Sequence, residues 1–202
     1  MGIVKSAPFL FMAILKRNFY NRDTLVVAKD LLGKFIIRQI GKKKLAGKIV
    51  EVEAYNGPND RASHANRGKT ERNKIMFGHP GFSYVYMIYG MYYCFNIVTE
   101  SHGYPAAVLI RAVEPVNAPL IRGARGVNKT NGPGKFCKTF EINKKINGLD
   151  LCKKEKIWLE DRGIKIKKVE IARAKRIGVD YAGEYKNKLW RFYLTGNKFA
   201  SN

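Results

Sequence analysis

Two segments decide the fold: Lys48–Tyr55, which reads KIVEVEAY, and Phe82–Val98, which reads FSYVYMIYGMYYCFNIV. Both have the composition and alternation of β-strands. Because side chains along a strand point alternately to opposite faces, three residues of the first segment share one face: Glu51, Glu53 and Tyr55. The second segment carries five tyrosines within ten residues. Two carboxylates opposite a tyrosine-rich hairpin indicate acid–base chemistry on an aromatic substrate.

The charge of the chain indicates an anionic partner. Lys and Arg number 38 against 16 Asp and Glu, which gives a net charge of +22. Such an excess attracts phosphate backbones or anionic membrane surfaces, although a lysine-rich genome would produce it too. No apolar run reaches the length of a membrane span. We therefore expect a nucleic acid, whose bases are aromatic and whose backbone is anionic, and no membrane.

Length and composition predict one globular domain. The chain has 202 residues, of which 46% are hydrophobic, enough for a single core. We expect this domain over 19–202, preceded by a loosely packed N-terminal segment over 1–18. The apolar run Ala7–Leu15 in that segment lacks the cleavage site of a signal peptide. Met12 is an alternative start of the chain.

The cysteines and histidines do not form a metal-binding pattern. There are three of each, and no C-x-x-C pair occurs. We interpret the three cysteines as reduced and structural, which is typical of an intracellular chain: Cys94, Cys137 and Cys152. His79 and His102 receive no role. The pattern therefore predicts no zinc site.

The remaining segments predict an α+β domain with a largely antiparallel sheet and flanking helices. Helices are expected at Asp23–Gly33, Asn117–Gly126 and Lys135–Ile142. Strands are expected at Phe35–Ile40, Leu45–Tyr55, Ala106–Val113, Ile157–Glu160, Ile164–Ala172 and Leu189–Leu194. The glycine-containing stretch Arg176–Tyr185 is expected to be a loop.

Glu51 and Glu53 have two interpretations. One of them can be a general base, or both can belong to a solvated strand face or neutralise Arg111. Arg111 lies inside an apolar strand, where an arginine needs a carboxylate partner. A carboxylate held beside an arginine stays ionised and ready to accept a proton. Arg111 therefore favours catalysis, but periodicity alone does not choose between the two glutamates.

The hairpin and one glycine-rich stretch suggest contacts with nucleic acid. Tyr84 and Tyr86 share a face that is either core or pocket. Tyr89 lies at the predicted tip, beside Gly90, where an aromatic residue can act as a wedge between stacked bases. The stretch 132–135 reads GPGK, which lacks the spacing of a triphosphate loop but opens a helix that could hold a DNA phosphate.

The ordered motifs of the chain resemble those of the alkyladenine (3-methyladenine) DNA glycosylase family. The resemblance runs from about Phe19 to about Ser201 and is specific because many motifs recur in order. They are IVEVEAY at 49–55, GP at 57–58, ASH at 62–64, RN at 72–73, MF at 76–77, PG at 80–81, YVY at 84–86, IYGMY at 88–92, LIRA at 109–112, EP at 114–115, NGPGK at 131–135, RIGV at 176–179 and RFY at 191–193, with Asp60.

The resemblance implies hydrolysis of the bond between an alkylated or deaminated purine and deoxyribose in duplex DNA. It implies that Glu53 is the general base for water, which Arg111 and the Val179 backbone help to hold. It further implies that three side chains contact the flipped base: Tyr55, His64 and Tyr86. It also implies that Asn96 selects among purines and that Tyr89 fills the gap left in the duplex. The implied fold is a single compact α+β domain with a curved antiparallel sheet. The implied partner is damaged double-stranded DNA, and the implied state is a monomer without metal or organic cofactor.

Two alternatives remain at this stage. A non-catalytic RNA- or DNA-binding module would suit the charge and the tyrosines, but it leaves paired carboxylates on a basic face unexplained. A glycosylase/lyase would use a lysine Schiff base, and no lysine stands in a recognisable catalytic setting. The expected location is the cytoplasm, with the nucleoid, in a prokaryote and the nucleus in a eukaryote.

Overall fold

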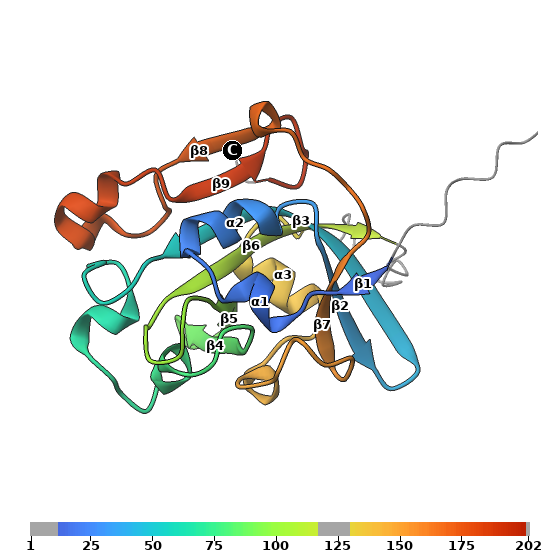
Figure 1. Ribbon diagram of the computed structural model, residues 1–202, viewed down its shortest axis with the longest axis horizontal. Helices are drawn as coiled ribbons and strands as arrows, with labels where there is room; N and C mark the ends of the chain where they lie inside the picture. The colour runs from blue at the N-terminus through green and yellow to red at the C-terminus, as the bar shows by residue number, and fades with distance from the viewer. Residues whose placement is uncertain (1–11, 117–129, 201–202) are drawn as a thin grey trace, which may run out of the picture.

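The computed structural model describes residues 12–116 and 130–200, which form a single domain around one curled sheet (Figure 1). The strands are β1 (Ala13–Ile14), β2 (Phe35–Ile40), β3 (Lys43–Tyr55), β4 (Ser83–Ile88), β5 (Tyr92–Val98), β6 (Ala107–Val116), β7 (Ile157–Asp161), β8 (Ile171–Ala174) and β9 (Arg191–Leu194). The α-helices are α1 (Arg17–Tyr20), α2 (Thr24–Leu31) and α3 (Pro133–Thr139). Short 3-10 helices span His64–Arg67, Lys74–Phe77, Lys144–Ile146, Lys168–Glu170 and Asp180–Asn187.

The pairing confirms the predicted fold class. The strand order is β1-β7-β2-β3-β6-β5-β4, and β9 adds to β3 and carries β8. Every pairing between these strands is antiparallel. The described residues therefore make an α+β domain in which strands from both ends of the chain meet in one sheet.

Strand β3 is the centre of the sheet and carries the two predicted carboxylates. It is thirteen residues long and pairs with β2, β6 and β9. Its pairing with β6 shifts register on either side of Glu51, which is the mark of a β-bulge. From Ile49 to Ala54 every side chain is buried, because other elements cover both faces of the strand.

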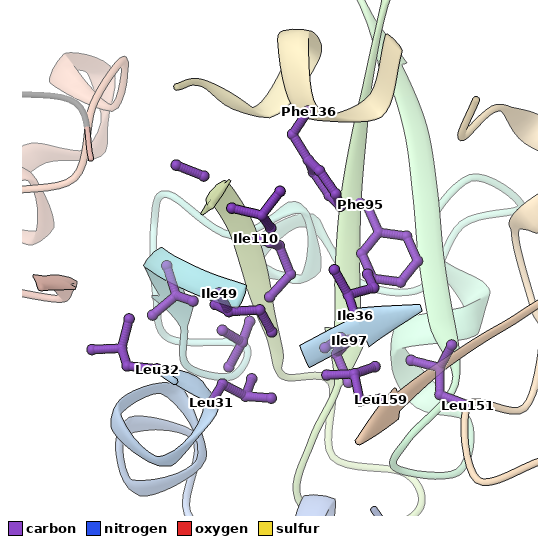
Figure 2. Close-up of a cluster of buried hydrophobic side chains, with 14 of the residues drawn as sticks. Leu31, Leu32, Ile36, Ile49, Phe95, Ile97, Ile110, Phe136, Leu151 and Leu159 are labelled. Carbon is purple, nitrogen blue, oxygen red and sulfur yellow. The ribbon is translucent and has the colours of Figure 1, made fainter. Parts of the chain in front are cut away.

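The core lies between the sheet and the helices (Figure 2). Helix α2 packs against β3 and β6, and α3 packs against β5 and β6. Figure 2 shows Leu31 of α2 and the following Leu32 among isoleucines of four strands, which are Ile36, Ile49, Ile97 and Ile110. In the same view Phe95 of β5 lies next to Phe136 of α3. The two phenylalanine rings meet edge to face at 6.3 Å. Full burial of each such side chain contributes about 1.5–3 kcal/mol, which fixes β3, β5 and β6 relative to one another.

The cap residues of α2 and the turn residues of the hairpin lie where the sequence predicts them. The side chain of Asp23 accepts a hydrogen bond from the backbone N–H of Val26 at 2.9 Å, so it caps α2. Gly33 follows the helix at a φ of +83°. Tyr89, Gly90 and Met91 connect β4 to β5. Tyr89 and Gly90 have φ values of 51° and 68°, the positive angles of a tight hairpin turn.

Two element predictions were wrong. Ile164–Ala172 is not one strand, because Lys168–Glu170 forms a 3-10 helix and strand β8 begins only at Ile171. Ile166 packs against Gly33, the glycine after α2, instead of pairing in the sheet. The expected loop Arg176–Tyr185 contains 3-10 turns from Asp180 onward.

Several other predictions are confirmed or lie outside the described residues. The three cysteines form no disulfide, as expected. Strand β1 pairs with β7 and Leu15 is buried, so the segment before residue 18 joins the sheet where it is described; the domain boundary at 18 stays a prediction. The helix expected at Asn117–Gly126 lies outside the described residues. No helix within the described ranges is long and apolar enough to cross a membrane.

Candidate active site

A cavity of about 410 Å³ opens where β3 ends beside the β4–β5 hairpin. Its wall also includes the loop after β3, the loop 177–181 and Pro133 at the start of α3. All the residues predicted to form the site line this one cavity: Glu53, Tyr55, His64, Tyr86, Tyr89, Asn96, Arg111 and Val179. The structure therefore brings together residues that are up to 126 positions apart in the chain.

Arg111 joins the two carboxylates of β3. Its Nε donates to Glu51 Oε1 at 3.0 Å, and its Nη1 lies 3.2 Å from Glu53 Oε1. Arg191 donates to the same oxygen of Glu51, also at 3.0 Å. Both glutamates are fully buried. Glu51 is thus held between two arginines and does not line the cavity, whereas Glu53 does.

Both oxygens of Glu53 accept hydrogen bonds from the protein. The backbone N–H of Ile177 donates to Oε1 at 2.8 Å, and the Tyr55 hydroxyl donates to Oε2 at 3.0 Å. Burial raises the pKa of Glu53, and Arg111, the Ile177 N–H and Tyr55 oppose that rise. From sequence we expected Arg111 to decide this balance. Desolvation outweighs it because strand pairing removes water from both sides of β3.

An aromatic cluster forms one wall of the cavity. The rings of His64 and Tyr86 lie 4.5 Å apart between centroids, and Tyr84 lies 5.2 Å from Tyr86. Nδ1 of His64 is 2.8 Å from the Tyr84 hydroxyl. Burial first, then the charges of Arg72 and Arg67, lower the pKa of His64 to about 4. The imidazole is therefore neutral at pH 7.

A buried ion pair between Asp60 and Arg176, which was not predicted from the sequence, supports the other side of the cavity. Arg176 makes two hydrogen bonds to Asp60, at 2.5 and 2.8 Å, and a third to the Ala54 carbonyl at 2.9 Å. Its guanidinium lies 4.8 Å from the centre of the Tyr55 ring. Asp60 and Arg176 are 116 positions apart, so no local signal connects them. The pair fixes the segment whose next residue, Ile177, donates to Glu53.

The hairpin tip is exposed and apolar. Tyr89 is 85% exposed and Met91 67% exposed. Both therefore lie outside the core, as the sequence predicted for Tyr89.

Asn96 is buried at the opposite end of the hairpin, and its amide donates to the Tyr84 carbonyl at 3.1 Å.

The described residues hold no group of three or more metal-ligating side chains. Lys135, for which the sequence suggested a phosphate contact, is exposed on α3. Its ammonium group donates to Asn131 Oδ1 at 3.3 Å. That contact with phosphate stays a prediction.

Residues 18–198 match the profile of a family described as methylpurine-DNA glycosylase. A protein of Methanocella arvoryzae named "Putative 3-methyladenine DNA glycosylase" is 50% identical over 188 residues, covering 90% of this chain and 92% of its own. Proteins with the same name from Alkaliphilus oremlandii and Clostridium novyi are each 50% identical over 201 and 205 residues. These alignments cover 93% and 94% of this chain and 98% and 99% of theirs.

Proposed function

Because the chain belongs to the methylpurine-DNA glycosylase family, we infer that it is a 3-methyladenine DNA glycosylase acting in base excision repair. It hydrolyses the N-glycosyl bond between a damaged purine and deoxyribose. Inside a duplex that bond is out of reach of a side chain, so the nucleotide must be flipped out of the stack, which costs a few kcal/mol. The cavity beside the hairpin receives the flipped base.

The observation that carries the mechanism is the position of Glu53. It is a fully buried carboxylate, fixed by Ile177 and Tyr55, on the wall of an aromatic cavity in a strongly basic protein. Glu53 takes a proton from the attacking water, which the Arg111 side chain and the Val179 backbone help to hold. Its negative charge also stabilises the positive charge that develops on the sugar as the base leaves.

Glu51 does not perform this role. Arg111 and Arg191 share its Oε1, and it is absent from the cavity wall. Its carboxylate provides a negative charge that neutralises two buried arginines of the sheet. These contacts support the choice of Glu53, which periodicity alone left open.

The aromatic residues hold the base. Tyr55, His64 and Tyr86 offer ring faces and edges to a flipped purine, and a cationic alkylated purine gains cation–π attraction to a tyrosine. Because positively charged purines are also better leaving groups, modest assistance suffices for them. No lysine of the described chain lines the cavity, which argues against a lyase that works through a lysine Schiff base.

The defining experiment uses duplexes that each contain one lesion. The native protein should convert 3-methyladenine, 7-methylguanine, hypoxanthine or ethenoadenine sites, one or several of them, into abasic sites. A protein that binds these duplexes but leaves every glycosyl bond intact would be a binding module instead.

Tyr89→Ala should reduce excision from a fully paired duplex while leaving the protein folded. Tyr89 is almost fully exposed, so its removal costs the core nothing. In the complex its ring replaces stacking worth about 1–3 kcal/mol per base, so we expect a loss of about 5- to 150-fold. A lesion in a mispaired, weakly stacked setting should lose less, because flipping costs less there. Equal losses in both settings, with a lowered Tm, would contradict this role.

Asn96→Ala should loosen purine selection. Asn96 lines the cavity and is held by its hydrogen bond to the Tyr84 carbonyl. Membership of the family implies that its side chain collides with the extra amino group of guanine. We expect excision of guanine-derived lesions to rise relative to adenine-derived ones. The measurement is the ratio of single-turnover rate constants for 7-methylguanine and ethenoadenine. An unchanged ratio in a folded variant would remove Asn96 from the selection.

A further inference from the structure

A groove, which we call the α2 groove, lies between the outer side of α2 and the segment 164–171. Its volume is about 750 Å³. None of the described residues in its wall lines the cavity that contains Glu53. Val52 and Ala54 of β3 pack in the same buried cluster as α2, so Glu53 between them points to the opposite face of the strand. The α2 groove therefore lies across the sheet from the site of base excision.

The wall of the α2 groove combines apolar and cationic side chains. Its apolar residues come from both helices and from the segment after β7: Phe19, Val26, Leu32, Ile164, Ile166 and Ile171. Its cations are Arg22, Lys29, Lys34, Lys165 and Lys168. Asp30 is the one carboxylate among the described residues of this wall.

Three of these five cations lack a counter-charge. Arg22 pairs with Asp30 at 2.9 Å, and Lys34 pairs with Asp161 at 2.6 Å. The other three form no ion pair within residues 12–116 and 130–200: Lys29, Lys165 and Lys168. Unpaired lysines beside apolar surface attract a ligand that carries both negative charge and apolar groups.

The segment 164–166 has an unpaired backbone. It belongs to no strand, and its N–H and C=O groups form no hydrogen bond with another described residue. Ile164 and Ile166 both lie beside Gly33, whereas Lys165 between them is exposed. This alternation is typical of a strand, but no partner strand is present in the part of the chain that the structure describes. Free backbone groups in such a segment can pair with a strand from another chain.

Charge and shape favour one kind of occupant. A second copy of this chain, with its net charge of +22, would be repelled by the unpaired lysines. Duplex DNA would satisfy the lysines, but its phosphates offer nothing apolar to Val26 and Ile164 and no strand to pair with the free backbone. An extended acidic peptide with apolar side chains supplies all three contacts.

We propose that the α2 groove binds an extended, acidic segment of a partner protein. The segment pairs its backbone with residues 164–166 and places alternate apolar side chains against Val26 and Ile164. Its carboxylates face Lys165 and Lys168. Because the groove and the catalytic cavity lie on opposite sides of the sheet, the partner and damaged DNA can be bound together. This binding surface is independent of the excision reaction.

The first test compares two synthetic peptides with the full chain. Both have about nine residues, the length of a strand, and the same charge. One alternates glutamate with leucine, and the other alternates glutamate with serine. The protein should bind the leucine peptide about 10-fold more tightly or better. Hydrogen exchange at the amides of Ile164, Lys165 and Ile166 should slow with the leucine peptide alone. Equal affinities, or unchanged exchange, would show charge attraction only and overturn the proposal.

The second test reverses charge in the groove. Lys165→Glu with Lys168→Glu should weaken binding of the leucine peptide by about 10-fold or more. The matched control, Lys42→Glu with Lys153→Glu, makes the same change in net charge at exposed lysines outside the groove. It should weaken binding by less than about 3-fold. Equal weakening in both variants would overturn the proposal.

Excision and melting complete the comparison. Both double variants should keep the native Tm, because all four lysines are exposed. They should also excise a lesion at equal rates. Slower excision by the groove variant alone would mean that DNA occupies this surface, which would contradict the proposal. If the groove variant melts early, the exchange measurement on the native protein decides.

Discussion

Glu53→Gln should reduce single-turnover excision by about 10²- to 10⁴-fold or more, with the fold and the binding of lesion-containing duplexes retained. Glutamine keeps the size of the side chain and one acceptor for the Ile177 N–H, but it cannot take a proton from water. It also removes the negative charge next to the developing sugar cation. Binding should survive, because a carboxylate contributes nothing favourable toward a phosphate backbone.

Glu51→Gln is the matched control, because Glu51 lies two residues before Glu53 on the same strand. It should keep appreciable turnover, and its cost should fall on stability, because two arginines then share a neutral partner. Excision, duplex binding and thermal melting of both variants distinguish the roles. A nearly normal rate for Glu53→Gln, or an inactive Glu51→Gln that folds and binds, would reverse the assignment.

The pH dependence of excision provides a second check on Glu53. Excision needs the ionised carboxylate, and the pKa of Glu53 is raised because burial outweighs its contacts with Arg111, Ile177 and Tyr55. As the pH falls, the rate should therefore decline at a higher pH than the ordinary pKa of a glutamate would give. This acid limb should be missing from the residual activity of Glu53→Gln.

Asp60→Asn should lower the free energy of unfolding by about 3–5 kcal/mol. Asp60 and Arg176 are both buried and joined by two hydrogen bonds, so removing the acid leaves a buried guanidinium without a counter-charge. Excision should fall as well, because the Asp60–Arg176 ion pair holds Tyr55 and the segment whose backbone N–H donates to Glu53. Chemical denaturation monitors the first effect and single-turnover excision the second.

Two further variants make this prediction specific. Asp30→Asn breaks an ion pair with Arg22 whose side chains are 37% and 48% exposed, and it should cost no more than about 1 kcal/mol. Replacing both buried partners, as in Asp60→Asn with Arg176→Met, should recover part of the lost stability because no unpaired charge remains. A mild Asp60→Asn phenotype, or no recovery in the double variant, would show that the buried pair is not a unit.

The elements that could be predicted from sequence are those whose signals are local. Asp23 and Gly33 mark the ends of α2, strand alternation places Glu51 and Glu53 on one face, and Tyr89-Gly90 has the residues of a tight turn. The carboxylate partner expected for Arg111 is present twice. These features depend on neighbours within a few positions or on the physical cost of a buried charge.

The features that could not be predicted depend on contacts between distant segments. Asp60 and Arg176 meet only because the loop after β3 and the segment before Asp180 pack together. The sign of the pKa shift of Glu53 depends on how completely β6, β9 and residue 177 exclude water, which composition does not report. Ile164–Ala172 has a strand-like pattern, but Ile164 and Ile166 lie beside the glycine that follows α2, and only Ile171 and Ala172 join the sheet, in β8.

The product analysis of a single-lesion duplex tests the central claim most directly. A duplex with one hypoxanthine or 3-methyladenine is incubated with the native protein, and the free base, abasic sites, strand breaks and borohydride-trapped adducts are measured together. We predict free base and abasic sites in equal amounts, without strand breaks or trapped adduct, and the same products about 10²- to 10⁴-fold more slowly from Glu53→Gln. Binding without release of base, or a covalent adduct with DNA, would contradict the account.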